Sequence, residues 1–339
     1  MNKQKLLDDF VAKWSDLPPQ RSQQWLADRT FSIGASEMGT VLDFNPYQNV
    51  RELIERHTDI TGLGDRTAMN WGNVMEPVIT SLTEIIFNCT IVEMGSIPTA
   101  GAQHQRCSPD GVALVKMLGD LIISFEFKAP ARRMPCGHIP PYYEAQVLAC
   151  LCAVVPADLG IFVDVVIRRC APEHWTFKSL DYCKIYHRPY NFDSVVAKAV
   201  LYFYSTSDDE FKGEPINYGI APPEDFDLLL SNIADAKTIK TEYGQVRTAN
   251  DEDISIEDEL NNNIKKNCIG YLPLKIMKVE IIPVKKDPGY VARLQDKIDT
   301  IIDIIRMVCS APQDERKTIL AHECDKHNFP IAVRRKWGT

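Results

Sequence analysis

Apolar residues recur at helical spacing along the first part of the chain, and the spacing changes near Thr90. The helical period predicts amphipathic helices over residues 4–14, 50–57 and 69–87. From Thr90 onward, short apolar runs bounded by turn residues predict strands over 90–97, 104–108, 111–116 and 121–128. Pro140 and Pro141 then open a predicted helix over 142–154, because proline is favoured in a first helical turn. A strongly apolar strand is predicted over 158–167.

This order of helices, strands, a helix and another strand predicts an α/β fold with a central mixed β-sheet flanked by helices. Beyond Arg168 the pattern leaves two assignments open. In the first, a strand over 275–284 and an amphipathic helix over 291–305 complete the core, and residues of about 170–270 are an insertion. In the second, residues 176–205 supply the last strand and helix, with the helix over 193–205. We expect one domain over 1–310 and a C-terminal tail over 311–339.

Composition excludes several classes of protein. With 339 residues, 45% of them hydrophobic, the chain is long enough for a sizeable core but has no apolar run that could span a bilayer. The N-terminal segment does not resemble a signal peptide, and the ten cysteines lack the spacing of a disulfide framework or a metal cluster. We therefore expect an intracellular protein. The net charge of −8 disfavours a protein that coats nucleic acid, but it permits a local basic channel.

The residues with the clearest chemistry are Asp110, in the turn S-P-D-G, and Glu126 and Lys128, at the end of the predicted strand 121–128. Strand alternation places Glu126 and Lys128 on one face and Phe127 on the other. Two carboxylates can hold Mg²⁺ while an ammonium group meets a water or a phosphate, as phosphodiester hydrolysis requires. By its spacing alone, the pattern is as compatible with a surface turn followed by a solvated strand as it is with a metal site.

Neighbouring motifs change this balance. The segment Q24-W-L-A-D-R29 and Ser36 precede W71-G-N-V-M-E76, and Y143-E-A-Q146 follows the Glu-Phe-Lys motif. Taken in this order, the motifs resemble the PD-(D/E)xK nuclease superfamily, and within it the lambda exonuclease-like (YqaJ-like viral recombinase) family. The resemblance covers residues of about 22–168 and resumes at 275–305. It implies a restriction-endonuclease-like core.

The resemblance also implies a metal site. Asp110, Glu126 and the backbone carbonyl of Phe127 would be ligands, and Glu76 would complete the acidic cluster. Mg²⁺ is the expected cofactor, with two ions expected, and Mn²⁺ can substitute. Lys128 would position the attacking water and neutralise charge, and Gln146 would line the same cleft. A plainer interpretation of Glu76 is a solvent-facing acid on the first turn of a helix.

In the family, residues matching Arg29 and Ser36 bind the terminal phosphate of a DNA end. Arginine suits this role because its planar donors bind phosphate oxygens in pairs. Ser108, Tyr143, Arg132 and Arg133 are further candidates for DNA or phosphate binding. The plainer interpretations are an N-cap for Ser36, packing for Tyr143 and ordinary exposed arginines. We interpret His104 and His138 as ordinary polar residues.

The resemblance predicts a metal-dependent DNA exonuclease that degrades double-stranded ends 5′→3′ and leaves 3′ single strands for recombination, repair or viral DNA processing. Expected partners are double-stranded DNA ends, a single-strand annealing protein and further copies of the chain, since the phage enzymes are trimeric rings; no membrane is expected. If the protein is viral, it would act in the host cytoplasm or nucleus. The alternatives are a structure-selective endonuclease of the same fold and a non-catalytic DNA-binding scaffold. Such a scaffold would usually lack one of the three groups Asp110, Glu126 and Lys128, all of which are present here.

Overall fold

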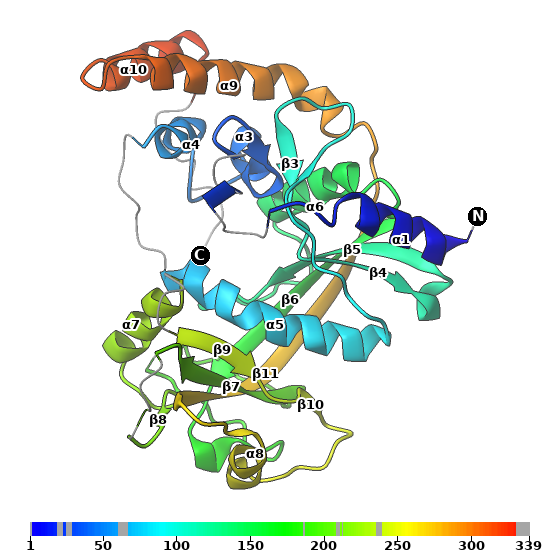
Figure 1. The fold of residues 1–339 in the computed structure, drawn as a ribbon, viewed down its shortest axis with the longest axis vertical. Helices are drawn as coiled ribbons and strands as arrows, with labels where there is room; N and C mark the ends of the chain where they lie inside the picture. Colours follow the sequence, from blue (N-terminus) through cyan, green and yellow to red (C-terminus); the bar gives the residue numbers. More distant parts are fainter. Residues whose placement is uncertain are drawn as a thin grey trace.

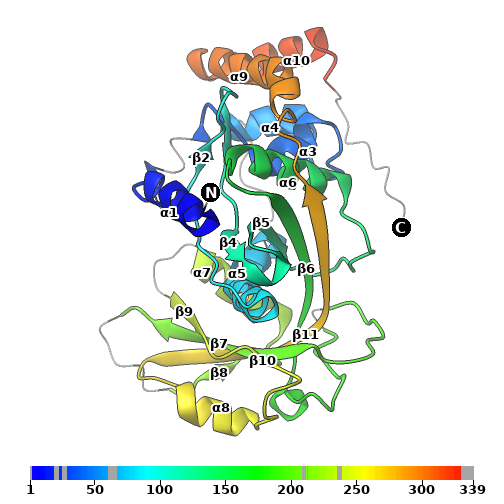
Figure 2. The ribbon, with the colours of Figure 1, turned by 90° about the vertical axis from the view of Figure 1, so that its right-hand side faces the viewer.

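A twisted β-sheet runs through the whole molecule (Figures 1 and 2). The computed structural model describes residues 2–18, 23–24, 29–59, 67–185, 187–207, 211, 213–234 and 239–329. The main strands follow in the order β10 (Arg247–Thr248), β7 (Ala197–Ser205), β11 (Cys268–Lys285), β6 (Leu159–Arg169), β5 (Leu121–Lys128) and β4 (Gly111–Val115). Two short strands lie off this path: β8 (Ile216–Asn217) pairs with β11, and β9 (Ile239–Tyr243) pairs with β7.

The sheet is mixed, as the sequence predicts. Strand β5 is parallel to β6 but antiparallel to β4, and β11 is antiparallel to both β6 and β7. The parallel pair is joined by a crossover through helix α6 (Pro141–Ala153), which begins at the predicted proline. The predicted fold class, a central mixed sheet flanked by helices, is therefore confirmed.

Helices cover both faces of this sheet. Helix α5 (Thr67–Phe87) and helix α7 (Pro223–Ala234) bury one face, where Phe125, Phe127 and Val163 belong to the core. The alternate residues of the same strands face the other way, so that Phe162 packs against Val147 of α6. Helix α8 (Ile256–Asn263) covers the far end of this second face. The period-2 pattern of the strands is thus satisfied by two separate helical layers.

The remaining helices form a second core beside α6, at one end of the molecule (Figure 1). Its members are the 3₁₀ turn η1 (Ala35–Glu37), α3 (Met38–Val41), α4 (Val50–His57), α9 (Gln295–Ser310) and α10 (Arg316–Lys326). A small sheet, with β3 (Gln105–Cys107) between β1 (Ile33–Gly34) and β2 (Ile97–Pro98), joins this core to the main one. Helix α1 (Lys3–Lys13) packs beside β4 and β5. Leu320 and Cys324 of α10 lie in the core, although we expected residues 311–339 to be a tail; residues 330–339 lie outside the described part.

The structure decides between the two assignments of the last core elements. Strand 275–284 lies within β11, directly beside β6, and α9 follows it, so the last strand and helix of the first assignment are confirmed. The interpretation of residues of about 170–270 as an insertion stays a prediction. The helix predicted over 193–205 is wrong, because 197–205 form β7, which pairs with β11 rather than with β6. Eight of its nine residues are buried from both sides, and such uniform burial removes the period that distinguishes a strand from a helix. The strand that the second assignment needs before this helix is also missing, because the described residues of 176–192 form none.

Two bulk expectations can be compared with the structure. Among the described residues, no helix is long and apolar enough to cross a membrane. All ten cysteines lie in the described part of the chain and none forms a disulfide, which agrees with the prediction of free thiols.

Candidate functional site

Asp110 lies in the turn that leads from β3 into β4. Its carboxylate accepts the backbone N–H of Phe127 at 2.7 Å, which joins this turn to the end of β5. The next residue, Gly111, packs so closely against Ile91 that an added Cβ would lie 2.2 Å from its Cγ2 atom. The sequence Asp-Gly therefore combines an acid that reaches the neighbouring strand with a residue that has no side chain to obstruct the turn.

The end of β5 supplies the other two charged groups. Glu126 is only 1% exposed, and its carboxylate forms an ion pair with Lys128. Phe127 points to the opposite face and packs in the core beneath α5. The predicted alternation of these three residues is confirmed. The plainer interpretation as a solvated strand is wrong, because β5 is an interior strand with a buried acid, Glu126, rather than an exposed edge.

Burial and charge shift the titration of both groups. Burial, together with the nearby charge of Asp110, raises the pKa of Glu126 to about 8, although Lys128 opposes this. Burial alone would lower the pKa of Lys128, but the charges of Glu126 and Asp110 outweigh it and raise the pKa above its usual value. The second carboxylate oxygen of Glu126, Oε2, is buried and accepts no hydrogen bond from the residues that the structure describes. A cation beside these acids would satisfy this oxygen and relieve their repulsion.

The backbone of Phe127 adds an oxygen to this place. Gly111 pairs with Phe125, and beyond that pair β4 has ended, so the same edge of β5 is open at Phe127. In a strand the N–H and C=O of one residue point to the same side, and the N–H of Phe127 meets Asp110. The carbonyl therefore faces the side of Asp110. Carboxylate and carbonyl oxygens are the ligands that Mg²⁺ prefers, so these residues fit the expected ion.

In the described residues, no group of three or more His, Cys, Asp or Glu side chains is drawn together as a metal cluster. Glu76 is therefore not part of such a cluster. Its negative charge nevertheless contributes to the raised pKa of Glu126, although less than burial and the charge of Asp110 do. Glu76 lies in the interior of α5, nine residues after its first residue at Thr67, so its interpretation as a first-turn acid is wrong.

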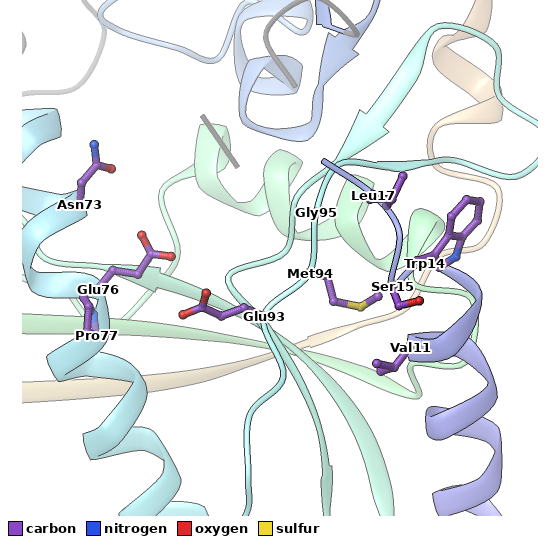
Figure 3. A pocket seen from close by; sticks show the side chains of 10 residues that line it. All are labelled: Val11, Trp14, Ser15, Leu17, Asn73, Glu76, Pro77, Glu93, Met94 and Gly95. Atoms are coloured by element: carbon purple, nitrogen blue, oxygen red, sulfur yellow. The ribbon is translucent and has the colours of Figure 1, made fainter. Parts of the chain in front are cut away.

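Glu76 also lines a cavity of about 500 Å³ between α5, the end of α1 and the segment of residues 93–95. Figure 3 shows Glu76 and Glu93 reaching into this cavity from opposite sides, with Asn73 above Glu76 on the helix. Trp14 and Met94 close the far end. The acid is therefore accessible from solvent through a mixed polar and apolar cavity.

Arg29 is held next to Gly34 and Glu37. Its guanidinium is 3.9 Å from the Glu37 carboxylate, and a Cβ on Gly34 would lie 2.3 Å from its Nη2 atom. Burial raises the pKa of the Cys107 thiol, and among the charges that act on this thiol are those of Glu126, Asp110 and Arg29. The structure thus brings Arg29 to the neighbourhood of the carboxylates from a distant part of the sequence.

Ser36 and Ser108 lie near the same place. Strands β1 and β3 are parallel neighbours, and the two serines follow the ends of these strands. Ser36 is exposed and lies inside η1, whose N-cap is Gly34, so the interpretation of Ser36 as an N-cap is wrong. Ser108 is half-buried, directly after β3.

The sequence did not reveal the network that holds Arg29. Glu37 is 5% exposed and accepts the backbone N–H of Gly34 at 2.7 Å; it also contacts His57 Nε2 at 3.0 Å and pairs with Arg56. Burial would raise the pKa of Glu37, but His57, Arg56 and Arg29 outweigh it and hold the pKa well below its usual value. Glu37 is adjacent to the predicted Ser36, but no sequence signal links it to two residues on α4.

Tyr143 lies on the first turns of α6, with Lys128 Nζ 5.1 Å above the centre of its ring. Arg133 approaches the same ring at 5.7 Å and forms a 2.7 Å ion pair with the buried Asp164 of β6. Gln146 is one turn further along α6 and only 9% exposed. Tyr143 therefore contacts the charged site directly, in addition to its packing on Phe162 at 5.6 Å.

The other candidates have separate surroundings. Arg132 is exposed, and its backbone carbonyl accepts the Tyr190 hydroxyl at 3.3 Å. His104 Nε2 lies 3.2 Å from Arg306, and His138 Nδ1 lies 3.1 Å from the carbonyl of Cys136. These contacts fit the interpretation of the two histidines as ordinary polar residues.

Comparison with known proteins agrees with the resemblance inferred from the motifs. Residues 24–154 match the model of the YqaJ-like viral recombinase domain, so the predicted resemblance is confirmed over the part of the chain that contains the site. Protein D345L of African swine fever virus (isolate Tick/South Africa/Pretoriuskop Pr4/1996) is 25% identical over 326 residues, which cover 88% of this chain and 89% of that protein. D345L from the isolate Tick/Malawi/Lil 20-1/1983 is 24% identical and covers 87% of each chain.

Among solved structures, the chain is similar to an alkaline exonuclease from Laribacter hongkongensis. The TM-score is 0.41 and the sequence identity 14%, over 90% of this chain and all of that one.

Proposed function

We propose that this protein is a metal-dependent DNA exonuclease that hydrolyses phosphodiester bonds from the 5′ ends of double-stranded DNA. The observation that carries the proposal is the convergence of Asp110, Glu126 and Lys128, from a turn and a strand, at one partly buried place. The match of residues 24–154 to the YqaJ-like viral recombinase domain supports it, because all three residues fall within the match.

Asp110, Glu126, the Phe127 carbonyl and Glu76 would hold Mg²⁺, with Mn²⁺ as a substitute. When bound, the ions supply Lewis acidity and stabilise the attacking and leaving oxygens of the displacement. Lys128 is fixed by its ion pair with Glu126 and would orient a water molecule toward the phosphorus atom. Attack by this water forms a P–O bond and breaks the bond to the 3′ oxygen, which takes up a proton as the mononucleotide departs. The remaining strand then keeps a 5′ phosphate.

Arg29, Ser36 and Ser108 would bind the terminal phosphate and so select the 5′ end. The guanidinium is well suited to this role because Gly34 and Glu37 fix its position before DNA arrives. Removal of the 5′ strand would leave a 3′ single strand, the substrate of an annealing partner in recombination or repair. A homotrimer that encloses the DNA would keep the enzyme on its substrate between successive cuts.

The decisive experiment is digestion of linear duplexes labelled at either end, with and without a 5′ phosphate, in the presence of Mg²⁺. We expect release of mononucleotides from the 5′ strand, faster with the phosphate than without it. Lys128→Ala should abolish this release, and Arg29→Ala should remove only the preference for the phosphate. Cleavage of closed circular DNA, or unchanged digestion by Lys128→Ala, would refute the proposal.

A further inference from the structure

A row of aromatic rings leads from the surface to the proposed catalytic lysine. Tyr47, in the loop between α3 and α4, meets Tyr142 edge-on, with ring centres 6.0 Å apart. Tyr142 contacts Tyr143 with ring centres 4.2 Å apart, and Lys128 Nζ lies 5.1 Å from the centre of the Tyr143 ring. Three successive contacts therefore connect an exposed ring to the charged site.

Tyr47 contributes little to the core, since 75% of its surface is exposed. The loop that carries this ring is nevertheless held by hydrogen bonds. The backbone N–H of Tyr47 donates to Asn45 Oδ1 at 3.0 Å, and the Asn45 amide donates to Thr40 at 2.9 Å. The backbone N–H groups of Phe44 and Asn45 both donate to the Gly39 carbonyl, at 2.8 and 3.0 Å. An exposed ring on a well-held loop loses less conformational freedom when a ligand covers it than a ring on a mobile loop.

Helix α6, which carries Tyr142, packs closely against α3. A Cβ on Gly39 would lie 2.6 Å from Tyr142 Cβ and 2.8 Å from Tyr142 Cα, so α3 and α6 approach each other through their backbones. This close approach places the loop of Tyr47 against the first turn of α6. The fold thus holds the backbones that carry Tyr47 and Tyr142 next to each other.

Charge next to these rings indicates what they would bind. Lys128 and Arg133 both lie over the ring of Tyr143, at 5.1 and 5.7 Å. Aromatic rings for bases, next to cations for phosphates, are the usual combination in sites for single-stranded nucleic acid. A nucleotide whose phosphate lies at Lys128 would have its neighbouring base within reach of the outer rings.

We propose that Tyr47 and Tyr142 form a stacking site for an unpaired nucleobase of the strand being cut, next to the phosphodiester held at Lys128. The inference rests on the proposed nuclease function and names how that site holds its substrate. Because every base has an aromatic face, such a site tolerates any sequence, which an exonuclease needs as it advances. The stacked base would keep the end of the duplex open at the point of cleavage.

A thermodynamic cycle between the protein ring and the base tests the inference. Initial rates of 5′ end digestion give kcat/KM for the wild type and Tyr47→Ala, each on a normal duplex and on one with abasic sites at the terminal nucleotides. We expect Tyr47→Ala to lose roughly tenfold in kcat/KM on the normal duplex, and the abasic sites to cost the wild type about as much. The two changes together should cost no more than either alone.

Two variants serve as controls. Tyr47→Phe keeps the ring and should retain wild-type rates on both substrates. Tyr243→Ala removes a tyrosine that is 47% exposed on β9, far from α6 in the fold, and should also behave as the wild type. Thermal unfolding of Tyr47→Ala should be close to that of the wild type, because the removed ring is mostly exposed.

The outcomes separate the two proposals. If the wild type digests both duplexes and the two changes multiply, Tyr47 acts independently of the base and the stacking site is refuted, while the nuclease function stands. Unchanged kcat/KM of Tyr47→Ala on the normal duplex would also refute the inference, because the ring would then contribute nothing to holding the strand. If the wild type cuts neither substrate, the nuclease function itself fails, and the stacking site with it.

Discussion

The carboxylate of Asp110 accepts the backbone N–H of Phe127 at 2.7 Å. This hydrogen bond connects the turn before β4 to the end of β5, where Glu126 and Lys128 lie on either side of Phe127. The Asp110 side chain therefore both joins the turn to the strand and places its negative charge beside Glu126. The proposed metal site is therefore assembled by the same contact that ends the pairing of β4 with β5.

Asp110→Asn should separate these two roles. An asparagine keeps an oxygen that can accept the Phe127 N–H, so the free energy of unfolding should change by less than about 1 kcal/mol. It lacks the negative charge that a metal ion needs, so nuclease activity should fall roughly 100-fold or more. Urea unfolding and digestion of a linear duplex measure the two effects. Comparable loss of stability and activity would contradict the separation; Asp110→Ala, which loses both roles, is the reference.

Gly111 provides a test of how the turn is positioned. Gly111→Ala would place a Cβ 2.2 Å from Ile91 Cγ2, and we expect it to destabilise the protein by about 1–3 kcal/mol and to lower activity by displacing Asp110. Adding Ile91→Ala removes the clashing group and should restore part of the activity. Gly72→Ala is the matched control, because a Cβ there meets no atom of the described residues within 4 Å, and alanine in a helix should stabilise by about 0.5–1 kcal/mol. No rescue by Ile91→Ala would show that the contact does not position the turn.

The sequence pattern predicted those elements in which the spacing of apolar residues matches the face that packs in the core. Strand β5 is buried on both faces, but its residues 124–128 alternate between apolar side chains toward α5 and polar or charged side chains toward the site. The orientation of Glu126 and Lys128 followed from this alternation. Strand β7 is buried on both sides, so its residues lack alternation and were assigned to a helix. Periodicity reports the contrast between two environments, and it fails where a strand has only one.

The candidate site was predictable where residues are close in sequence or ordered as motifs. Asp110, Glu126, Lys128 and Tyr143 come together as expected. Glu37 and its partner His57 could not be predicted, because their contact depends on how α4 packs beside η1. The same holds for Tyr47 and Tyr142, which meet only because Gly39 allows α3 and α6 to approach closely. Contacts of this kind arise from tertiary packing and leave no local period in the sequence.

Stability at acidic pH should depend on Glu37. Burial raises its pKa, but the charges of His57, Arg56 and Arg29 outweigh burial and hold the folded pKa well below the usual 4.5. The stabilisation is therefore present above pH 4.5 and is lost as pH falls toward the folded pKa. We expect Glu37→Gln to cost about 3–5 kcal/mol at pH 7, because the partner cations lose their buried counter-charge, and much less at low pH. Urea unfolding across this range measures the difference.

Two comparisons complete this test. The pKa of His57 is lowered by burial but raised overall by Glu37, so its own contribution is present below pH 6.5 and is lost as pH rises through the folded pKa. His57→Gln should therefore have its largest effect on the acid side of neutrality, opposite to Glu37→Gln. Glu242→Gln, which removes a carboxylate on β9 paired with the exposed Lys240 and Lys265, should change stability little at any pH. A deficit of Glu37→Gln that does not vary with pH would exclude the ionic explanation.

His187 should limit stability in mild acid. Burial, together with the charges of Arg168 and Arg169, lowers the pKa of His187 from 6.5 to about 2. The unfolded chain then binds one more proton than the folded protein below pH 6.5, so the free energy of unfolding falls by up to about 1.4 kcal/mol for each pH unit below this value. Asparagine at this position can still accept the Arg169 N–H that His187 Nε2 accepts at 3.3 Å, but it does not titrate. His187→Asn should therefore flatten the dependence of stability on pH between 6.5 and 4.5, whatever it does to stability at pH 7.

Unfolding in urea at several pH values gives this slope, and His138→Asn, which replaces an exposed histidine, should keep the wild-type slope. An equal slope in His187→Asn and the wild type would show that His187 is not the group that takes up the proton.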